Sequence, residues 1–184
     1  METLETSGEL RAWVGCLGCY SAGRLVGKWS TVEDIAELPA NCSRCGSDEW
    51  WCMDHDLPGG MGEMCPAEFV RRVEFLNGLD DCDASGRYSA ELEHVLAYWD
   101  NAGWDYAPED PSDAFRAAAD LFMFECDSHG GTSMAYALAD FMDWHDDELP
   151  DWVRVDWEGI GNDANHIYNV CEMRGGGWAV FFHG

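Results

Sequence analysis

The stretch Trp13-Val-Gly-Cys-Leu-Gly-Cys-Tyr-Ser-Ala-Gly-Arg-Leu-Val-Gly-Lys-Trp29 determines the fold predicted for the first part of the chain. Aromatic, small and β-compatible residues over 11–20 predict a strand, and the small residues 21–23 that follow predict a turn. Because residues 25–29 return to a strand-like composition, the whole stretch predicts a β-hairpin.

Two further elements complete a small domain around this hairpin. Residues 31–38 predict a short helix with Thr31 as its N-cap, and residues 39–47 predict a loop. Residues 49–54 contain two Trp and one Met and predict a third strand. A small antiparallel sheet with one short helix is therefore expected at the start of the chain.

Apolar residues at helical spacing dominate the middle of the chain. Two helices are predicted to begin at Pro66 and Pro111, because Pro is favoured in the first turn of a helix. Asp110 is expected to cap the second of them. Two others are predicted over residues 89–101 and 132–146. The apolar set of the helix that begins at Pro111 is taken to include Phe122.

The last part of the chain predicts a mixture of elements. Residues 156–170 predict a short helix that Gly159 and Gly161 weaken, and residues 178–182 predict a strand after a glycine turn at 175–177. The order of elements indicates an α+β protein. We expect three small domains, namely a sheet domain at 1–62, a helical domain at 63–128 and a mixed α+β domain at 129–184.

The charge of the chain restricts its binding partners. Its 184 residues include 36 Asp and Glu but only 10 Lys and Arg, which gives a formal net charge of −26. Residues 79–184 hold 23 acidic and four basic side chains, whereas residues 1–78 hold 13 and six. Because such a chain repels phosphate backbones and anionic lipid, we expect no direct binding to nucleic acid or to a membrane.

The sequence also predicts the compartment. Residues 1–6 have neither the basic nor the apolar region of a signal peptide, and no run approaches 18 apolar residues. We therefore expect a cytoplasmic protein whose nine cysteines stay reduced. Free thiols or a metal site are favoured over a disulfide framework.

Two CxxC pairs, Cys16 with Cys19 and Cys42 with Cys45, have the spacing of a four-thiolate zinc site. One geometric argument opposes this interpretation. Residues three apart in a strand face opposite sides, so a continuous strand would separate the first two thiols. The chain would need a bend between them, which Gly18 could provide.

Other interpretations of the cysteines stay open. A rival metal-binding set joins Cys42 and Cys45 to Cys52 and His55. Reduced cysteines can also act simply as small buried hydrophobic side chains. A thioredoxin-like role is not favoured, because that chemistry needs a helix N-terminus and no helix is predicted to start at Cys16. Structural zinc is thus a possible cofactor, and no other cofactor is expected.

Carboxylates recur at helical spacing in the second half of the chain. On the helix predicted to end at Asp146, Asp140, Asp143 and Asp147 would share one face, roughly 5–6 Å apart along the axis. Duplex DNA carries one charge per about 1.7 Å of axis, a density that two or three such stripes would approach. The candidate partner-binding carboxylates are Asp80, Asp81, Asp83, Asp105, Glu109, Asp110, Asp113, Asp120, Asp140, Asp143, Asp146, Asp147, Glu148, Asp151, Asp156 and Glu158.

Composition alone permits other interpretations of this acidity. A solvated acidic surface, or adaptation to high salt, would also produce an excess of Asp and Glu. The ten Trp, the nine Cys and the uneven charge argue against the second. The sequence contains no HExxH, GxGxxG or Walker motif, so we expect no enzyme and no catalytic residue. The six histidines are interpreted as solvated or hydrogen-bonded.

Residues 13–29 resemble the opening of the ArdA antirestriction proteins, in which a hydrophobic strand leads to a Tyr, a small turn with Gly, and Gly-Lys/Arg-Trp. Residues 51–56, Trp-Cys-Met-Asp-His-Asp, are also similar to that family. So are residues 149–157, Leu-Pro-Asp-Trp-Val-Arg-Val-Asp-Trp, which resemble its acidic antirestriction segment. The Cys42/Cys45 loop and residues 159–162 depart from the family pattern.

The resemblance implies a DNA mimic of plasmids, transposons or phages, built as an elongated homodimer of three small domains. Such a protein binds a Type I restriction-modification enzyme, occupies the DNA site of the methyltransferase core, and blocks restriction and modification. Residues 149–158 match the antirestriction stretch. The alternative from another class is a zinc-stabilised acidic interaction module for a different basic partner.

Overall fold

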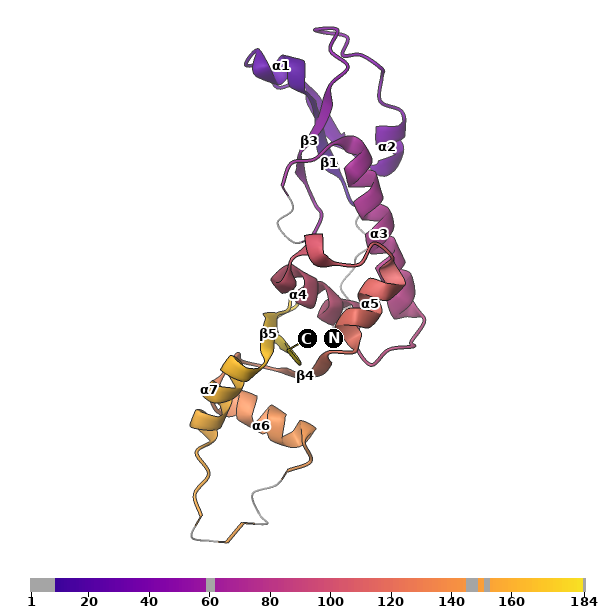
Figure 1. Ribbon diagram of the computed structural model, residues 1–184. Coiled ribbons are helices and arrows are strands. Elements are labelled where there is room, and N and C mark those ends of the chain that lie inside the picture. The colour runs from indigo at the N-terminus through magenta and orange to yellow at the C-terminus, as the bar shows by residue number, and fades with distance from the viewer. Residues whose placement is uncertain (1–8, 59–61, 145–148, 151–152, 184) are drawn as a thin grey trace. The chain divides into compact units, whose positions relative to one another are not determined.

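The computed structural model describes residues 9–58, 62–144, 149–150 and 153–183 (Figure 1). The chain forms two compact units, Met1–Gly78 and Leu79–Gly184, and each unit has its own three-stranded sheet. Helices and small antiparallel sheets occur together, which confirms the predicted α+β class. The boundary between the units coincides with the step in charge at residue 79. The division into three domains stays a prediction.

The first unit is built on an antiparallel sheet in the order β2-β1-β3. Trp13 and Trp29 are paired across β1 and β2, and their rings meet edge to face at 6.3 Å, which confirms the predicted hairpin. The elements of this unit are β1 (Ala12–Cys16), α1 (Leu17–Ser21), β2 (Gly27–Ser30), α2 (Val32–Ala36), β3 (Trp50–His55) and the first part of α3 (Pro66–Ala84).

The hairpin differs from the prediction at Cys16, where the strand ends and helix α1 begins. The Cys19 amide donates to the Cys16 Sγ at 3.5 Å, so the thiol caps the helix N-terminus. The Leu17 amide donates to the Glu49 carbonyl at 3.0 Å. Both the strand predicted through residue 20 and the absence of a helix start are therefore wrong, because the Cys16 thiol caps a helical turn there.

Helix α2 begins as predicted, with Thr31 as its N-cap. The Thr31 Oγ1 accepts from the Asp34 amide, and the Asp34 carboxylate accepts from the Thr31 amide, each at 3.2 Å. This reciprocal capping box satisfies two N–H groups at the helix start. Lys28 Nζ also donates to Asp34 at 2.8 Å, and Lys28 and Thr31 together lower the pKa of the Asp34 carboxyl.

The core of the first unit lies between the sheet and helix α3. Val14 and Cys52 contribute from the strands, and Phe69 and Val73 contribute from the helix. Helix α3 begins at Pro66, as the sequence predicts, and its apolar spacing sets Phe69 and Val73 one turn apart on the buried face.

The second unit is built on an antiparallel sheet in the order β4-β6-β5. Val180 and Phe181 of the central strand are fully buried, as is Met134 of helix α6. Besides the end of α3, the elements are α4 (Leu92–Ala102), the 3₁₀ helix η1 (Trp104–Tyr106), α5 (Pro111–Ala119), β4 (Phe122–Cys126), α6 (Gly131–Phe141), α7 (Trp157–Ile167), β5 (Asn169–Glu172) and β6 (Trp178–Phe181).

Two strands of this sheet are absent from the prediction. Phe122, assigned to the helix from Pro111, instead begins β4, because Asp120 ends α5 and the next residues pair with β6. Residues 169–170, assigned to a helix, belong to β5 on the other side of β6.

Helix α6 is shorter than predicted and ends at Phe141. Asp143 has a positive φ of 53°, its amide donates to the Asp140 carbonyl, and the Trp144 amide donates to the Ala139 carbonyl. These two bonds form a Schellman motif, which ends a helix with one residue in the left-handed conformation. The predicted helical face shared by Asp140 and Asp143 is therefore wrong.

Across the part of the chain that the structure describes, no helix combines the length and the apolar content needed to cross a bilayer.

Candidate functional sites

The acidic candidate residues all belong to the second unit, Leu79–Gly184. Asp146, Asp147, Glu148 and Asp151 lie outside the described residues. Of the other twelve, Asp83 is half-buried and its carboxylate accepts from the Leu92 amide at 2.9 Å. The remaining eleven are exposed, namely Asp80, Asp81, Asp105, Glu109, Asp110, Asp113, Asp120, Asp140, Asp143, Asp156 and Glu158.

Helix α5 carries candidate carboxylates at both ends. Asp110 is the N-cap, as predicted, and accepts from the Ser112 amide at 2.9 Å and the Asp113 amide at 3.1 Å. Asp113 lies in the first turn and accepts from Arg116 at 2.6 Å, and Asp120 is the C-cap. The partial positive charge of the helix N-terminus favours the first two carboxylates, while Asp120 has no such compensation.

Helices α6 and α7 present the next group. Asp140 is exposed in the last turn of α6. Asp156 is the N-cap of α7, where its carboxylate accepts from the Gly159 amide at 3.0 Å, and Glu158 lies in the first turn. The helix predicted over 156–170 is confirmed for Trp157–Ile167. The capping hydrogen bond thus fixes the direction of the Asp156 carboxylate. The Glu158 side chain is exposed to solvent.

Intramolecular ion pairs cannot neutralise this unit. The unit contains 23 acidic side chains but only four basic ones, all of them Arg. Arg116 pairs with Asp113, and Arg174 pairs with Asp100 at 2.8 Å. Three further exposed carboxylates add to the acidic surface although they are not among the predicted residues, namely Asp100, Asp163 and Glu172. Their exposure depends on the helix and strand boundaries, so in the sequence only the overall charge excess pointed to them.

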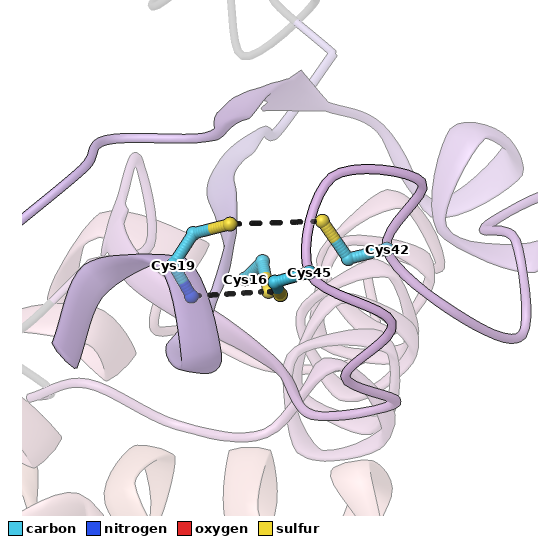
Figure 2. A group of neighbouring side chains, drawn as sticks. All are labelled: Cys16, Cys19, Cys42 and Cys45. Atoms are coloured by element: carbon cyan, nitrogen blue, oxygen red, sulfur yellow. Dashed lines mark hydrogen bonds between the residues drawn. The ribbon is translucent and has the colours of Figure 1, made fainter. Parts of the chain in front are cut away.

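Four cysteines of the first unit form a second candidate site, shown in Figure 2. The Sγ atoms of Cys16, Cys19, Cys42 and Cys45 all lie within 4.8 Å of one another. Cys16 and Cys45 sulfurs are 3.4 Å apart, and Cys19 and Cys42 sulfurs are 3.8 Å apart. The first predicted metal-binding set is therefore brought together, and each CxxC pair faces the other (Figure 2).

The geometric argument against this set does not apply, because strand β1 ends at Cys16. Because Cys16 ends the strand and Cys19 lies in helix α1, the two thiols turn to the same side. The rival set is not assembled. Cys52 is buried with Val14 in the sheet core, where burial raises its thiol pKa to about 11. His55 Nε2 lies 3.3 Å from the Gly62 carbonyl.

The environments of the clustered thiols differ from one another. The backbone N–H groups of Arg44 and Cys45 donate to Cys42 Sγ and lower its pKa to about 7. Burial, together with the neighbouring thiols, raises the Cys19 pKa to about 12. The two pKa values are therefore moved in opposite directions, by N–H donors at Cys42 and by burial at Cys19.

Comparison with known proteins places the chain in a family. The model of the family described as antirestriction protein (ArdA) matches residues 12–178 of the 184, from the start of β1 to the start of β6. The protein is an antirestriction protein, a member of a class directed against restriction enzymes. The chain belongs to the ArdA family, and the predicted resemblance is confirmed. No curated protein sequence matches it.

Proposed function

We propose that this antirestriction protein acts as a DNA mimic. Its target is a Type I restriction-modification enzyme, and its carboxylates take the positions of DNA phosphates in the basic groove of the methyltransferase core. The observation that carries the proposal is the exposure of eleven candidate carboxylates in a unit with 23 acidic and four basic side chains. Such a surface is suited to a partner that presents many Lys and Arg.

Inhibition in this mechanism follows from occupancy alone. The bound protein excludes duplex DNA from the groove, so both cleavage and methylation stop, and no catalytic residue is needed. Each carboxylate contributes through charge pairs and released counterions. No single side chain dominates such an interface, since exposed ion pairs each contribute about 0.2–1 kcal/mol.

The proposed partner surface can be tested by neutralising four carboxylates in the second unit and comparing the effect with that of neutralising four in the first. Glu109→Gln, Asp120→Asn, Asp140→Asn and Glu158→Gln together neutralise four exposed carboxylates of the second unit without touching an N-cap residue. We expect the quadruple variant to inhibit a Type I enzyme roughly tenfold or more weakly at low salt, and each single variant to inhibit at most several-fold more weakly.

The matched control neutralises four exposed carboxylates of the first unit, Glu33→Gln, Glu37→Gln, Asp48→Asn and Glu49→Gln, with the same change in net charge. We expect this control to weaken inhibition less than the second-unit variant does. Equal losses from the two sets would attribute the effect to net charge, and an equal loss from one substitution and from four would contradict a distributed interface.

A further set tests the acidic residues that directly precede the segment resembling the antirestriction stretch. We expect that neutralising Asp143, Asp146, Asp147 and Glu148 together weakens inhibition more than neutralising any one of them. The measurement is the inhibition constant in a cleavage assay and in a methylation assay with the same enzyme. The proposal requires parallel losses in both assays, because one groove serves both reactions.

We also propose that the protein is a homodimer encoded on a mobile element and active in the host cytoplasm. Several large apolar side chains are exposed on the second unit and are suited to a protein contact, among them Tyr136, Phe141 and Met142. Phe181, by contrast, is fully buried in the core. Light scattering coupled to gel filtration measures the mass, and a 20.6 kDa particle at micromolar concentration would contradict the dimer.

A further inference from the structure

We infer that Cys16, Cys19, Cys42 and Cys45 form a structural Zn²⁺ site that fastens the loop of residues 39–49 to the end of the first sheet. Two thiolates come from the turn between β1 and α1, and two come from the loop before β3. On binding, each thiol releases its proton to solvent, and the four sulfurs complete the coordination of one ion.

The sulfur positions match the coordination geometry of zinc. A Zn–S bond of about 2.3 Å in a regular tetrahedron places the sulfurs about 3.8 Å apart. Cys19 and Cys42 sulfurs are 3.8 Å apart, Cys16 and Cys45 sulfurs are 3.4 Å apart, and every pair lies within 4.8 Å. A single ion can therefore reach all four sulfurs with only small side-chain movements.

Backbone donors around the sulfurs suit thiolates. In the first CxxC pair, the amide of Cys19 donates to the Sγ of Cys16 at 3.5 Å. In the second, the amides of Arg44 and Cys45 donate to the Sγ of Cys42. Each CxxC turn thus points N–H groups at its first sulfur, the arrangement that orients ligands and stabilises their charge around a bound metal.

The backbone of the two turns is shaped so that they can approach each other. A Cβ at Gly18 would lie 2.8 Å from the Cβ of Ser47 and 3.3 Å from the Sγ of Cys45, so a side chain there would push the turns apart. Gly46 has a φ of +78°, which closes the second turn, and its amide donates to the Cys42 carbonyl at 2.8 Å. Both glycines therefore allow the two cysteine pairs to lie close together.

The loop buries little apolar surface of its own. Among residues 39–49, all of which the structure describes, Cys42 is the only buried side chain. The local core consists of Cys16, Cys19 and Cys42, with Val26 and Trp50 half-buried against it. Three small thiols bury little apolar area, whereas a structural zinc ion contributes folding free energy directly.

The donor set is specific for a closed structural site. Four sulfurs fill the coordination shell of Zn²⁺ and leave no position for water or substrate, so the site stabilises and does not catalyse. All-thiolate coordination also excludes the hard ions Mg²⁺ and Ca²⁺, which prefer oxygen. Iron and a pair of disulfides are the competing outcomes, and the experiment separates them.

The first test is metal analysis of the full-length protein purified under reducing conditions and dialysed. We expect one zinc per chain by mass spectrometry of the metals, and four thiols that become reactive only after a chelator is added. Replacement by Co²⁺ should give the intense visible bands of tetrahedral thiolate coordination. Iron in place of zinc, or two disulfides without metal, would overturn the assignment.

The second test uses variants with a matched control. Cys42→Ser and Cys45→Ser should each reduce bound zinc at least tenfold, whereas Cys65→Ser, outside the cluster in the same unit, should retain one zinc per chain. Hydrogen exchange gives a readout that does not depend on inhibition. A chelator should speed exchange over residues 39–49 and leave the second unit unchanged, and unchanged exchange in the loop would contradict a structural role.

Discussion

His94 joins the start of helix α4 to strand β4 through one buried side chain. Its Nδ1 accepts from the Glu91 amide at 2.8 Å, and its Nε2 lies 2.6 Å from the Glu125 carboxylate, so the neutral ring carries its proton on Nε2. The ring also stacks on Phe122 with the centroids 4.2 Å apart. The sequence predicts solvated or hydrogen-bonded histidines, and for His94 the second alternative applies.

We therefore expect His94→Ala to lower the free energy of unfolding of the second unit by about 2–3 kcal/mol, because it leaves the Glu91 amide without its acceptor and removes a buried ring. His166→Ala, at an exposed position of α7, is the control and should change it by less than about 0.5 kcal/mol. Urea unfolding measures both, and similar small effects would contradict the role of His94.

At the scale of elements, helix α2 depends on its capping box. Because the folded pKa of Asp34 is lowered below its ordinary value, the stabilisation is present above about pH 4 and is lost as the pH falls through the folded pKa. Asp34→Asn should cost roughly 0.5–1 kcal/mol at pH 7 and progressively less as the pH falls below about 4. Glu33→Gln controls for net charge. A cost that stays constant down to pH 3 would refute this account.

Helices α6 and α7 depend on a different feature, the absence of a side chain at Gly161. A Cβ there would collide with the carbonyl oxygen of Gly131, while Asn162 accepts from the Gly131 amide at 3.0 Å. We expect Gly161→Ala to lower the free energy of unfolding by about 1–3 kcal/mol, although Ala favours a helix by about 1 kcal/mol.

Asp163→Ala, at an exposed position of the same helix, is the matched control and should lie within about 0.5 kcal/mol of wild type. Thermal unfolding followed by circular dichroism compares the two variants. A Gly161→Ala protein that unfolds at or above the wild-type temperature would show that the helices need no such close approach.

The elements that could be predicted are those with a local signal. Thr31, Pro66 and the Asp110–Pro111 pair mark helix starts by their own chemistry, and all three starts are confirmed. Strands β4 and β5 could not be predicted, because each is defined by pairing with β6. The end of α6 could not be predicted either, because an Asp rather than a Gly occupies the left-handed position.

The same distinction applies to the candidate sites. The spacing of the cysteines narrowed the metal-binding residues to two sets, but only the turn at Cys16 decides between them. The acidic residues could be predicted as a charge excess, while the exposure of each depends on helix boundaries that pairing and capping fix. Sequence thus predicted the residue types of both sites more completely than their geometry.

At the scale of the whole molecule, charge is divided between the units, with net charges of −7 over residues 1–78 and −19 over residues 79–184. Inhibition through many charge pairs must weaken steeply as salt rises, because both surfaces release counterions on binding. We expect the logarithm of the inhibition constant to change linearly with the logarithm of salt concentration, and the quadruple second-unit variant to have a shallower slope. A slope near zero would point to an apolar interface.

The most direct measurement is competition between this protein and duplex DNA for a purified Type I methyltransferase core. Mimicry requires mutually exclusive binding, so the concentration of protein that displaces half of a labelled duplex should rise in proportion to the duplex concentration. The labelled duplex should be displaced completely at saturation. A ternary complex of enzyme, DNA and this protein, or displacement that reaches a plateau, would contradict the account.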